Sequence, residues 1–187
     1  RRAAALTRQL LAFSRKQVFQ PTLVDLDGLV LNMEDMLRRL LGADVFLKTS
    51  LHTRGAYLMA DPGQLEQVLL NLCINSRDAM PDGGNLMIEI ENVEMENSSR
   101  EIPDDLAQGD YIKLSVGDDG TGMSEDVLEK AMEPFFTTKE VGRGSGLGLS
   151  MVYGFAKQSN GHLEVRSEVG NGTTVIMYLP RSDESHV

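Results

Sequence analysis

The sequence predicts an α/β sandwich, in which helices pack on one face of a mainly antiparallel sheet. Alternating apolar residues, as in Leu86, Ile88 and Ile90, predict strands that bury one side only. Between such strands, apolar residues recur three and four positions apart and predict amphipathic helices. With 187 residues, of which 41% are apolar, the chain can bury the core of one full domain.

The first helix is predicted over residues 1 to about 18, and Pro21 ends it. Five residues spaced alternately three and four apart form a heptad-like seam, which suits packing on another helix. A terminal helix lying on its own domain fits the same pattern, so the residues alone leave both arrangements open. The seam consists of Ala3, Leu6, Leu10, Phe13 and Gln17.

The other helices are predicted from capping residues and helical spacing. Asp27 is expected to cap the second helix, and Asp61-Pro62 opens the third, because proline fits a first helical turn. Two more helices are expected in the second half of the chain. In order, the four helices span about 28–41, 61–80, 124–131 and 146–158.

Strands are predicted where apolar and β-branched residues alternate between turn signals. We expect 45–51 and 56–60 to form a strand pair. We also expect 162–167 and 173–179 to form a closing hairpin through Gly170-Asn171-Gly172. In order, the predicted strands span about 23–26, 45–51, 56–60, 86–90, 111–116, 162–167 and 173–179.

The composition argues against several functions. A net charge of −10 argues against a nucleic-acid surface, because phosphate backbones are met by clustered Lys and Arg. The single cysteine, Cys73, excludes an internal disulfide, and we expect a small core or surface residue there rather than a reactive thiol. The lack of a long apolar run or a signal peptide favours a cytoplasmic domain. Because the chain begins at Arg1-Arg2 without Met, we expect it to be part of a longer protein.

The predicted helix 61–80 carries a narrow polar stripe flanked by apolar residues. At about 100° per residue, the members of the stripe fall within roughly 80° of one another. Cys73 lies with Glu66 and Arg77 on the opposite face, which we expect to face solvent. Buried amides cost free energy unless they are paired, so the stripe should either bond internally or meet Mg²⁺ and nucleotide phosphates. The stripe consists of Gln67, Asn71, Asn75 and Asp78.

Two glycine-rich stretches predict a nucleotide site. In 142–149 the glycines open the last helix, where free N–H groups and the helix dipole favour phosphate. In 118–122, Asp118 ends a strand. Its carboxylate can accept a hydrogen bond from the exocyclic amine of adenine, a donor that guanine lacks at that position of the ring. Ordinary turn chemistry is the alternative for Asp118 and Asp119.

Five motifs, taken in order, resemble those of the sensor histidine kinases, which belong to the GHKL superfamily of ATPases and kinases. The resemblance covers 61–179 and implies a Bergerat-type two-layer α/β sandwich with a mixed, mainly antiparallel sheet, preceded by one helix of a dimerisation bundle. The motifs are an N box (Asn71-Leu-Cys-Ile-Asn75-Ser-Arg-Asp78-Ala79), a first glycine box (Asp118-Asp-Gly120-Thr-Gly122), a phenylalanine box (Glu133-Pro-Phe-Phe-Thr-Thr-Lys139), a second glycine box (Gly144-Ser-Gly146-Leu-Gly148-Leu) and a final glycine pair (Gly170-Asn-Gly172-Thr173).

By matching position, the resemblance implies a catalytic site that takes ATP and Mg²⁺. Asn75 is implied as the main Mg²⁺ ligand, with Asn71 nearby as the second catalytic and metal residue. Asp118 is implied to bind the adenine amine, and Thr173 to support the adenine side. The implied ATP-binding residues are Asn75, Asp78, Asp118, Gly120, Gly122, Phe135, Phe136, Lys139, Arg143, Gly144, Ser145, Gly146, Leu147, Gly148, Leu149 and Thr173.

The stretch from the phenylalanine box to Gly144 is implied to form a lid over ATP. Lys139 and Arg143 suit the phosphate tail, and solvated lid residues are an equally good interpretation of both. Ser145 stands where the family more often has Thr, and it keeps the hydroxyl.

The resemblance also implies a division of the chain and its partners. Residues 1–20 resemble the C-terminal part of a dimerisation helix, 21–180 the catalytic ATP-binding domain, and 181–187 a tail or linker. The family's phosphoacceptor is a His followed by an acidic residue, and none of His52, His162 and His186 matches it. We therefore expect γ-phosphate transfer to a histidine of a dimerisation domain outside this chain. A receiver domain as next partner, a homodimeric parent protein and a cytoplasmic location, in some cases as part of a membrane-bound sensor, are further expectations.

Two rival functions remain beside the protein-histidine kinase. ATPases of the gyrase, chaperone and mismatch-repair type resemble this chain, but they carry a Glu where Asn71 stands, to activate water. The other rival is a nucleotide-binding scaffold without transfer activity.

Overall fold

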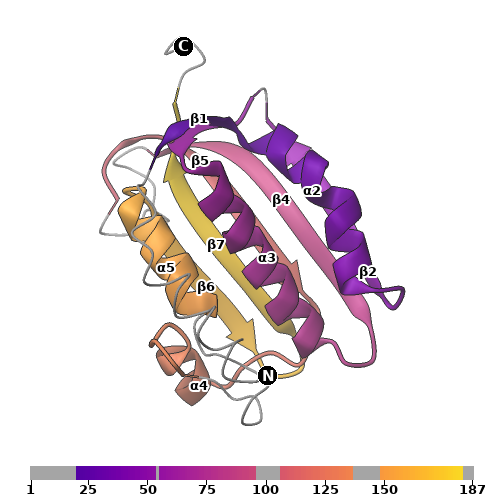
Figure 1. Cartoon of the computed structure of the whole chain (residues 1–187). Helices are drawn as coiled ribbons and strands as arrows, with labels where there is room; N and C mark the ends of the chain where they lie inside the picture. Colours follow the sequence, from indigo (N-terminus) through magenta and orange to yellow (C-terminus); the bar gives the residue numbers. More distant parts are fainter. Residues whose placement is uncertain (1–19, 54, 96–105, 137–147, 183–187) are drawn as a thin grey trace, which may run out of the picture.

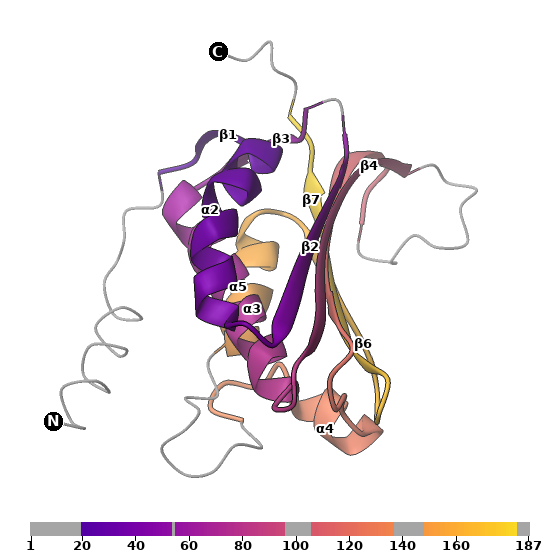
Figure 2. The same ribbon diagram turned by 90° about the vertical axis from the view of Figure 1, so that its right-hand side faces the viewer.

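Helices and a five-stranded sheet form two layers in the computed structural model, which describes residues 20–53, 55–95, 106–136 and 148–182 (Figures 1 and 2). The described helices are α2 (Leu26–Leu41), α3 (Pro62–Ala79), α4 (Glu125–Lys130) and α5 (Gly148–Gln158). The described strands are β1 (Thr22–Asp25), β2 (Val45–His52), β3 (Tyr57–Ala60), β4 (Gly84–Met95), β5 (Gly109–Asp118), β6 (His162–Glu168) and β7 (Gly172–Pro180).

The large sheet is mixed and mainly antiparallel, with the order β2-β4-β5-β7-β6. Only its β2–β4 pair is parallel, whereas β4–β5, β5–β7 and β6–β7 are antiparallel. Helices α2, α3 and α5 lie side by side on one face, with α3 in the middle (Figure 1). The expected α/β sandwich and its closing hairpin are therefore confirmed, while the expected helix 1–18 and the tail 183–187 lie outside the described residues.

The expected pairing of 45–51 with 56–60 is wrong. Strand β3 pairs with β1 in a separate two-stranded sheet over four residues, and β2 runs parallel to β4 over eight residues. Pairing with β4 satisfies more backbone hydrogen bonds of β2 than pairing with the short β3 could. The same choice lets Leu58 and Ala60 of β3 become buried beside the start of α2.

The expected cap of α2 is also wrong by two residues. Asp25 caps the helix, because its Oδ1 accepts a hydrogen bond of 3.2 Å from the Gly28 N–H. Leu26 is fully buried and its N–H donates to the Ala56 carbonyl at 2.9 Å, which fixes the first turn earlier than local sequence suggests. Asp27 then lies inside that turn, and it accepts from the Thr53 hydroxyl.

Helix α3 begins as predicted but buries a wider face than predicted. Its cap is Asp61, whose Oδ1 accepts from the Gln64 N–H at 3.1 Å. Cys73, expected on the solvent face, is fully buried in the core. The reason is the central place of α3, which has α2 on one flank and α5 on the other. Burial raises the pKa of the Cys73 thiol to about 12, so the thiol stays protonated and unreactive at neutral pH.

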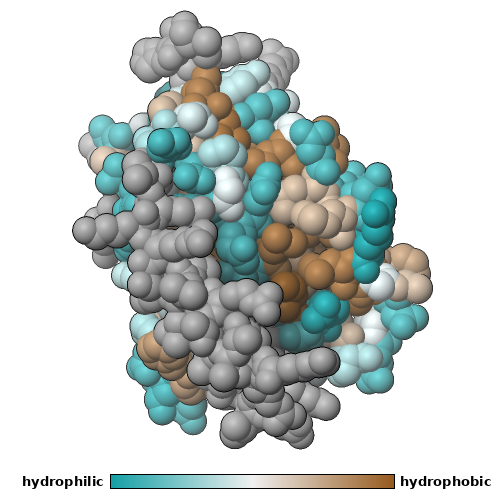
Figure 3. Space-filling model, viewed as in Figure 1, coloured by the Kyte–Doolittle hydropathy of each residue, from teal (hydrophilic) through white to brown (hydrophobic). Residues whose placement is uncertain are grey.

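The outer surface of the helix layer is partly apolar (Figure 3). Leu29 and Leu40 of α2 and Leu70 of α3 are partly buried residues that pack against the core.

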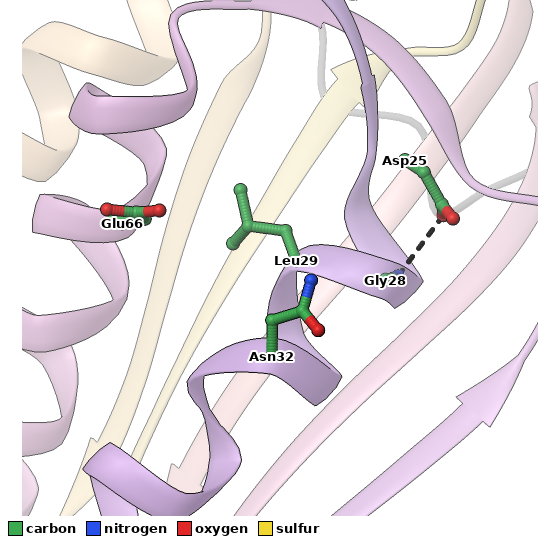
Figure 4. A pocket seen from close by; sticks show the side chains of 5 residues that line it. All are labelled: Asp25, Gly28, Leu29, Asn32 and Glu66. Carbon is green, nitrogen blue, oxygen red and sulfur yellow. Dashed lines mark hydrogen bonds between the residues drawn. The ribbon is translucent and has the colours of Figure 1, made fainter.

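Near the start of α2, a cavity of about 320 Å³ is lined by Asp25, Gly28, Leu29, Asn32 and Glu66 (Figure 4). None of the predicted site residues lines this cavity. Among the described helices, none has the length and apolar character required to span a bilayer.

We predict that the two faces of β4 respond differently to truncation. Ile88 is fully buried beneath the helices, whereas its neighbour Met87 is 36% exposed. Ile88→Ala should lower the free energy of unfolding by about 2–5 kcal/mol, because it leaves a cavity in the core. Met87→Ala, the matched control, should stay within about 0.5 kcal/mol. Urea unfolding followed by circular dichroism measures both, and equal losses would contradict this assignment of faces.

Candidate functional site

Four segments that are distant in sequence meet at one end of the sheet. They are the end of α3, the start of α5, the loop after β5 and the turn between β6 and β7 (Figure 1). Thr121 N–H donates to the Ala79 carbonyl at 2.9 Å, and Gly170 N–H donates to the Thr121 carbonyl at 2.8 Å. The loop after β5 is therefore fixed to α3 on one side and to the β6–β7 turn on the other.

The Asp118 carboxylate is held in one orientation at this junction. Its Oδ1 accepts from the backbone N–H of Gly120 at 3.0 Å and from that of Thr173 at 3.2 Å. Among the described residues, none donates a hydrogen bond to the second oxygen, Oδ2. Asp118 is half-buried, so it can present an acceptor to a ligand that approaches this end of the sheet.

The glycines of the first glycine box pack against protein backbone. A Cβ on Gly120 would lie 2.5 Å from the Ala79 carbonyl oxygen, and one on Gly122 would lie 1.9 Å from that of Glu168. Gly172 is equally tight, since its Cβ would lie 1.9 Å from the Asp118 carbonyl oxygen. Gly122 and Gly172 also have φ values of +65° and +86°. These glycines let the loop and the turn approach each other, a role that the sequence did not distinguish from ligand contact.

Asn85 anchors the second aspartate of the loop and was not singled out from the sequence. Its backbone N–H donates to Asp119 Oδ1 at 2.8 Å, and its Nδ2 donates to Asp119 Oδ2 at 2.7 Å. These two bonds hold the pKa of the Asp119 carboxyl below its ordinary value of 3.8. Asp119 thus joins the loop to the start of β4, whereas the local turn bond considered as the alternative is made by Asp118, whose Oδ1 accepts from the Gly120 N–H.

In the polar stripe of α3, Asn71 and Asn75 are half-buried at the border with α5, whereas Gln67 is exposed. Asn71 Oδ1 accepts from Gln67 Nε2 at 3.2 Å, and Asn71 Nδ2 lies 4.0 Å from the sulfur of Met151 on α5. Asn75 faces the first residue of α5, because a Cβ on Gly148 would lie 3.0 Å from Asn75 Nδ2. None of the described residues forms a hydrogen bond with the Asn75 side chain. Internal bonding therefore accounts for Asn71 but leaves the Asn75 amide available.

Asp78 is engaged by the neighbouring cation. Arg77 Nη2 and Nε donate to Asp78 Oδ1 at 2.9 and 3.2 Å, and Arg77 Nη1 donates to the Leu40 carbonyl at 3.3 Å. Arg77 therefore bridges from α3 to α2 rather than pointing freely into solvent, as the helical angle suggested.

The remaining predicted site residues divide into described and undescribed ones. Phe135 is 66% exposed with φ of +69°, Phe136 is half-buried, and Leu149 packs partly against the core. Thr173 lies beside Asp118 in the sheet. Lys139, Arg143, Gly144, Ser145, Gly146 and Leu147 lie outside the described residues.

Ser167 belongs to this site although no sequence pattern marked it. Its Oγ accepts from the Met123 N–H at 2.8 Å, lies 2.8 Å from Thr173 Oγ1 and can donate to the Gly172 carbonyl at 3.1 Å. The signal that could have found it is its place in the predicted hairpin, directly opposite Thr173.

The donors at this site suit a hard cation only together with anionic ligands. The described residues contain no group of three His, Cys, Asp or Glu side chains placed to hold a metal. The Asn75 amide, next to the described start of α5, fits a cation whose other ligands are phosphate and water oxygens.

Comparison with known proteins places residues 60–183 in the family described as "Histidine kinase-, DNA gyrase B-, and HSP90-like ATPase". The chain is 50% identical over 181 residues to sensor kinase CckA of Brucella abortus (strain 2308), covering 96% of this chain and 19% of that protein. It is 37% identical over 123 residues to sporulation kinase E of Bacillus subtilis (strain 168), covering 66% of this chain and 14% of that protein. The chain thus spans a fifth or less of the length of these relatives.

Solved structures share the fold. The mycobacterial sensor histidine kinase MprB matches with a TM-score of 0.68 and 21% identity over 86% of this chain and 97% of that chain. Full-length ShkA in complex with AMPPNP matches with a TM-score of 0.66 and 22% identity over 87% of this chain and 31% of that chain. At these identities the likeness concerns the fold alone.

We predict that the two glycines of the β6–β7 turn differ in their tolerance of alanine. Both have positive φ, but Gly170 has open space around it whereas Gly172 meets the Asp118 carbonyl. Gly170→Ala should cost about 1–2 kcal/mol of stability from the backbone conformation alone. Gly172→Ala should cost more, because it must also separate β7 from Asp118. Thermal and urea unfolding measure the difference, and equal costs would contradict the close approach of Gly172 to the Asp118 carbonyl.

We also predict a pH effect of the Asn85–Asp119 contact. A pKa held below 3.8 in the folded state means that this carboxylate stabilises the fold above pH 3.8, and that the contribution is lost as the pH falls through the lowered pKa. Asn85→Ala should raise the Asp119 pKa toward 3.8 and reduce the acid sensitivity of unfolding. Carboxyl NMR titration measures the pKa, with Asn171→Ala in the β6–β7 turn as the control. An unchanged Asp119 pKa in Asn85→Ala would contradict the assignment.

Proposed function

The chain belongs to the family of histidine kinase-, DNA gyrase B- and HSP90-like ATPase domains, and we propose that it is the ATP-binding catalytic domain of a sensor histidine kinase. In this role it binds ATP and presents the γ-phosphate to a histidine on a separate dimerisation domain. The observation that carries the proposal is the amide side chain of Asn71, at the position where hydrolytic members carry a glutamate.

A hydrolase of this fold needs a group that takes a proton from water. Among the described residues, the side-chain hydrogen-bond partners of Asn71 are Gln67 and Met151, and neither accepts a proton at neutral pH. A kinase has no such need, because the imidazole nitrogen of the acceptor is itself the nucleophile. Asn71 therefore favours transfer to histidine over hydrolysis.

Base recognition falls to Asp118 in this proposal. Its Oδ1 is occupied by two backbone donors, which leaves Oδ2 as acceptor for the exocyclic amine of adenine. Guanine places a carbonyl oxygen at the same position, and two acceptors repel each other. The arrangement therefore supports ATP over GTP.

The phosphates are assigned to the surface beside Asn75 and the beginning of α5, which lie next to each other. Asn75 and Asn71 would hold Mg²⁺, which supplies charge neutralisation of the phosphate oxygens when it is bound. The amide N–H groups at the start of α5 would bind the phosphates, as helix N-termini do. The glycines of 144–148, with Lys139 and Arg143, complete this assignment from the sequence.

The acceptor histidine is assigned to a partner domain. In the part of the chain that the structure describes, His52 ends β2, one residue beyond the predicted strand 45–51, and His162 begins β6. His52 Nε2 lies 2.7 Å from Ser50 Oγ and 3.7 Å from Glu89, away from the site. The proposed partners are a histidine-bearing dimerisation domain, a receiver domain and a second copy of the parent protein, in the cytoplasm.

We predict that Asn75→Ala abolishes Mg²⁺-dependent nucleotide binding and phosphotransfer. The test mixes the chain with a separate histidine-bearing helical bundle and ATP labelled at the γ-phosphate. Wild type should label the bundle, and Asn75→Ala should leave labelling lower by about 100-fold or more, as expected when a metal ligand is lost. Glu66→Ala, on the exposed flank of the same helix, is the matched control and should keep full transfer.

The outcomes separate the three functions. Release of inorganic phosphate without bundle labelling would identify an ATPase, and binding without either would identify a scaffold. Full transfer by Asn75→Ala would refute the metal assignment.

A further inference from the structure

The end of the sheet carries a row of three polar side chains in register. Across β5, β7 and β6, Asp118 pairs with Thr173, and Thr173 pairs with Ser167. Cross-strand partners point to the same face of a sheet. The two preceding rows on this face are apolar and belong to the core: Leu114–Met177–Leu163, then Val116–Val175–Val165.

The three polar residues are joined by hydrogen bonds. Met123 N–H donates to Ser167 Oγ at 2.8 Å, Ser167 Oγ lies 2.8 Å from Thr173 Oγ1, and Thr173 N–H donates to Asp118 Oδ1 at 3.2 Å. Ser167 thus touches the loop after β5, the β6–β7 turn and the neighbour of Asp118. It is half-buried, and its hydroxyl is the link between these groups.

Counting the hydroxyl protons leaves two possible arrangements of these hydrogen bonds. A hydroxyl has one proton, and Ser167 already accepts from Met123. If Ser167 donates to the Gly172 carbonyl at 3.1 Å, Thr173 must donate to Ser167 and can only accept from a ligand. If Ser167 donates to Thr173 at 2.8 Å, the Thr173 proton is free to point outward as a donor. Both arrangements keep the 2.8 Å contact between the two hydroxyls, and a ligand that offers an acceptor beside Thr173 selects the second arrangement.

We propose that Ser167 is a positioning residue for base recognition, which turns the Thr173 hydroxyl into a donor toward the purine ring. The inference rests on the proposed function, in which Asp118 Oδ2 accepts from the adenine amine. The Watson–Crick edge of adenine offers that amine as donor and the adjacent N1 as acceptor. An acceptor at Asp118 and a donor at Thr173 match this pair, whereas guanine presents the opposite pattern at both positions.

The test compares ATP with 1-deaza-ATP, in which a C–H replaces the ring acceptor N1. Dissociation constants of both nucleotides, and of GTP, are measured by calorimetry for wild type, Ser167→Ala, Thr173→Val and the double variant. Ser115→Ala, a buried serine on the other face of β5, is the matched control. Tm values are measured for each variant.

Wild type should bind ATP more tightly than 1-deaza-ATP. Ser167→Ala should weaken ATP about three- to tenfold, the value of one hydrogen bond, and leave 1-deaza-ATP unchanged. Thr173→Val should have the same selective effect, and the double variant should add little to either. Ser115→Ala should change neither constant.

Equal weakening of both nucleotides in Ser167→Ala would overturn the inference, because a merely structural role predicts it. Equal affinity of wild type for ATP and 1-deaza-ATP would overturn it without any variant. A separate variant, Asp118→Asn, tests the proposed function, and it should lower the ATP-over-GTP preference. If that preference falls in Asp118→Asn while Ser167→Ala keeps full discrimination against 1-deaza-ATP, only the inference fails. If Asp118→Asn leaves the preference intact, the base assignment itself fails.

Discussion

The site depends on the two hydrogen bonds that the Asp118 carboxylate accepts from backbone N–H groups. One donor belongs to its own loop, at Gly120, and the other to the first residues of β7, at Thr173. Bonds from backbone amides to an ionised carboxylate are stronger than neutral ones. They therefore fix the loop, the hairpin and the direction of the second carboxylate oxygen together. The glycines at 120, 122 and 172 are needed because these backbones come so close.

The packing of α3 between two helices explains the other half of the site. With α2 on one flank and α5 on the other, one face of α3 is buried and Cys73 becomes part of the core, while a strip of half-buried and exposed residues remains at the surface. The strip that remains beside α5 carries Asn71 and Asn75. A side chain at 148 would press on Asn75, so the glycine that opens α5 also leaves room for the Asn75 amide. The same contact between helices thus supplies stability and one side of the candidate site.

Local signals in the sequence predicted most elements, whereas long-range contacts decided the errors. Asp61-Pro62 and the Gly170–Gly172 turn carry their own information, and both were predicted correctly. The cap of α2 was misplaced because the Ala56 carbonyl, far along the chain, fixes Leu26. The predicted strand pair was wrong because β4 offers β2 a longer partner than β3 does. The local sequence of β2 and β3 carries no information about the length of β4.

The candidate site divides in the same way. Motif spacing predicted Asn71, Asn75, Asp118 and Thr173 as site residues. It did not mark Ser167, which only the register of the β6–β7 hairpin places opposite Thr173, and Thr173 in turn bonds to a residue 55 positions away. The sequence analysis did not single out Asn85 for the same reason, since its partner Asp119 lies 34 positions further along.

Register is also what connects the hydrophobic core to the chemistry of the site. A slip of one residue in β6 would move Ser167 to the other face of the sheet, together with Leu163 and Val165. Burial of those two side chains opposes such a slip, and it does so with apolar area that has no contact with a ligand. The polar row is therefore positioned by the apolar rows behind it. Because the two share one register, the geometry of the proposed base-recognition row needs no stabilising contacts beyond the hydrogen bonds of the row itself.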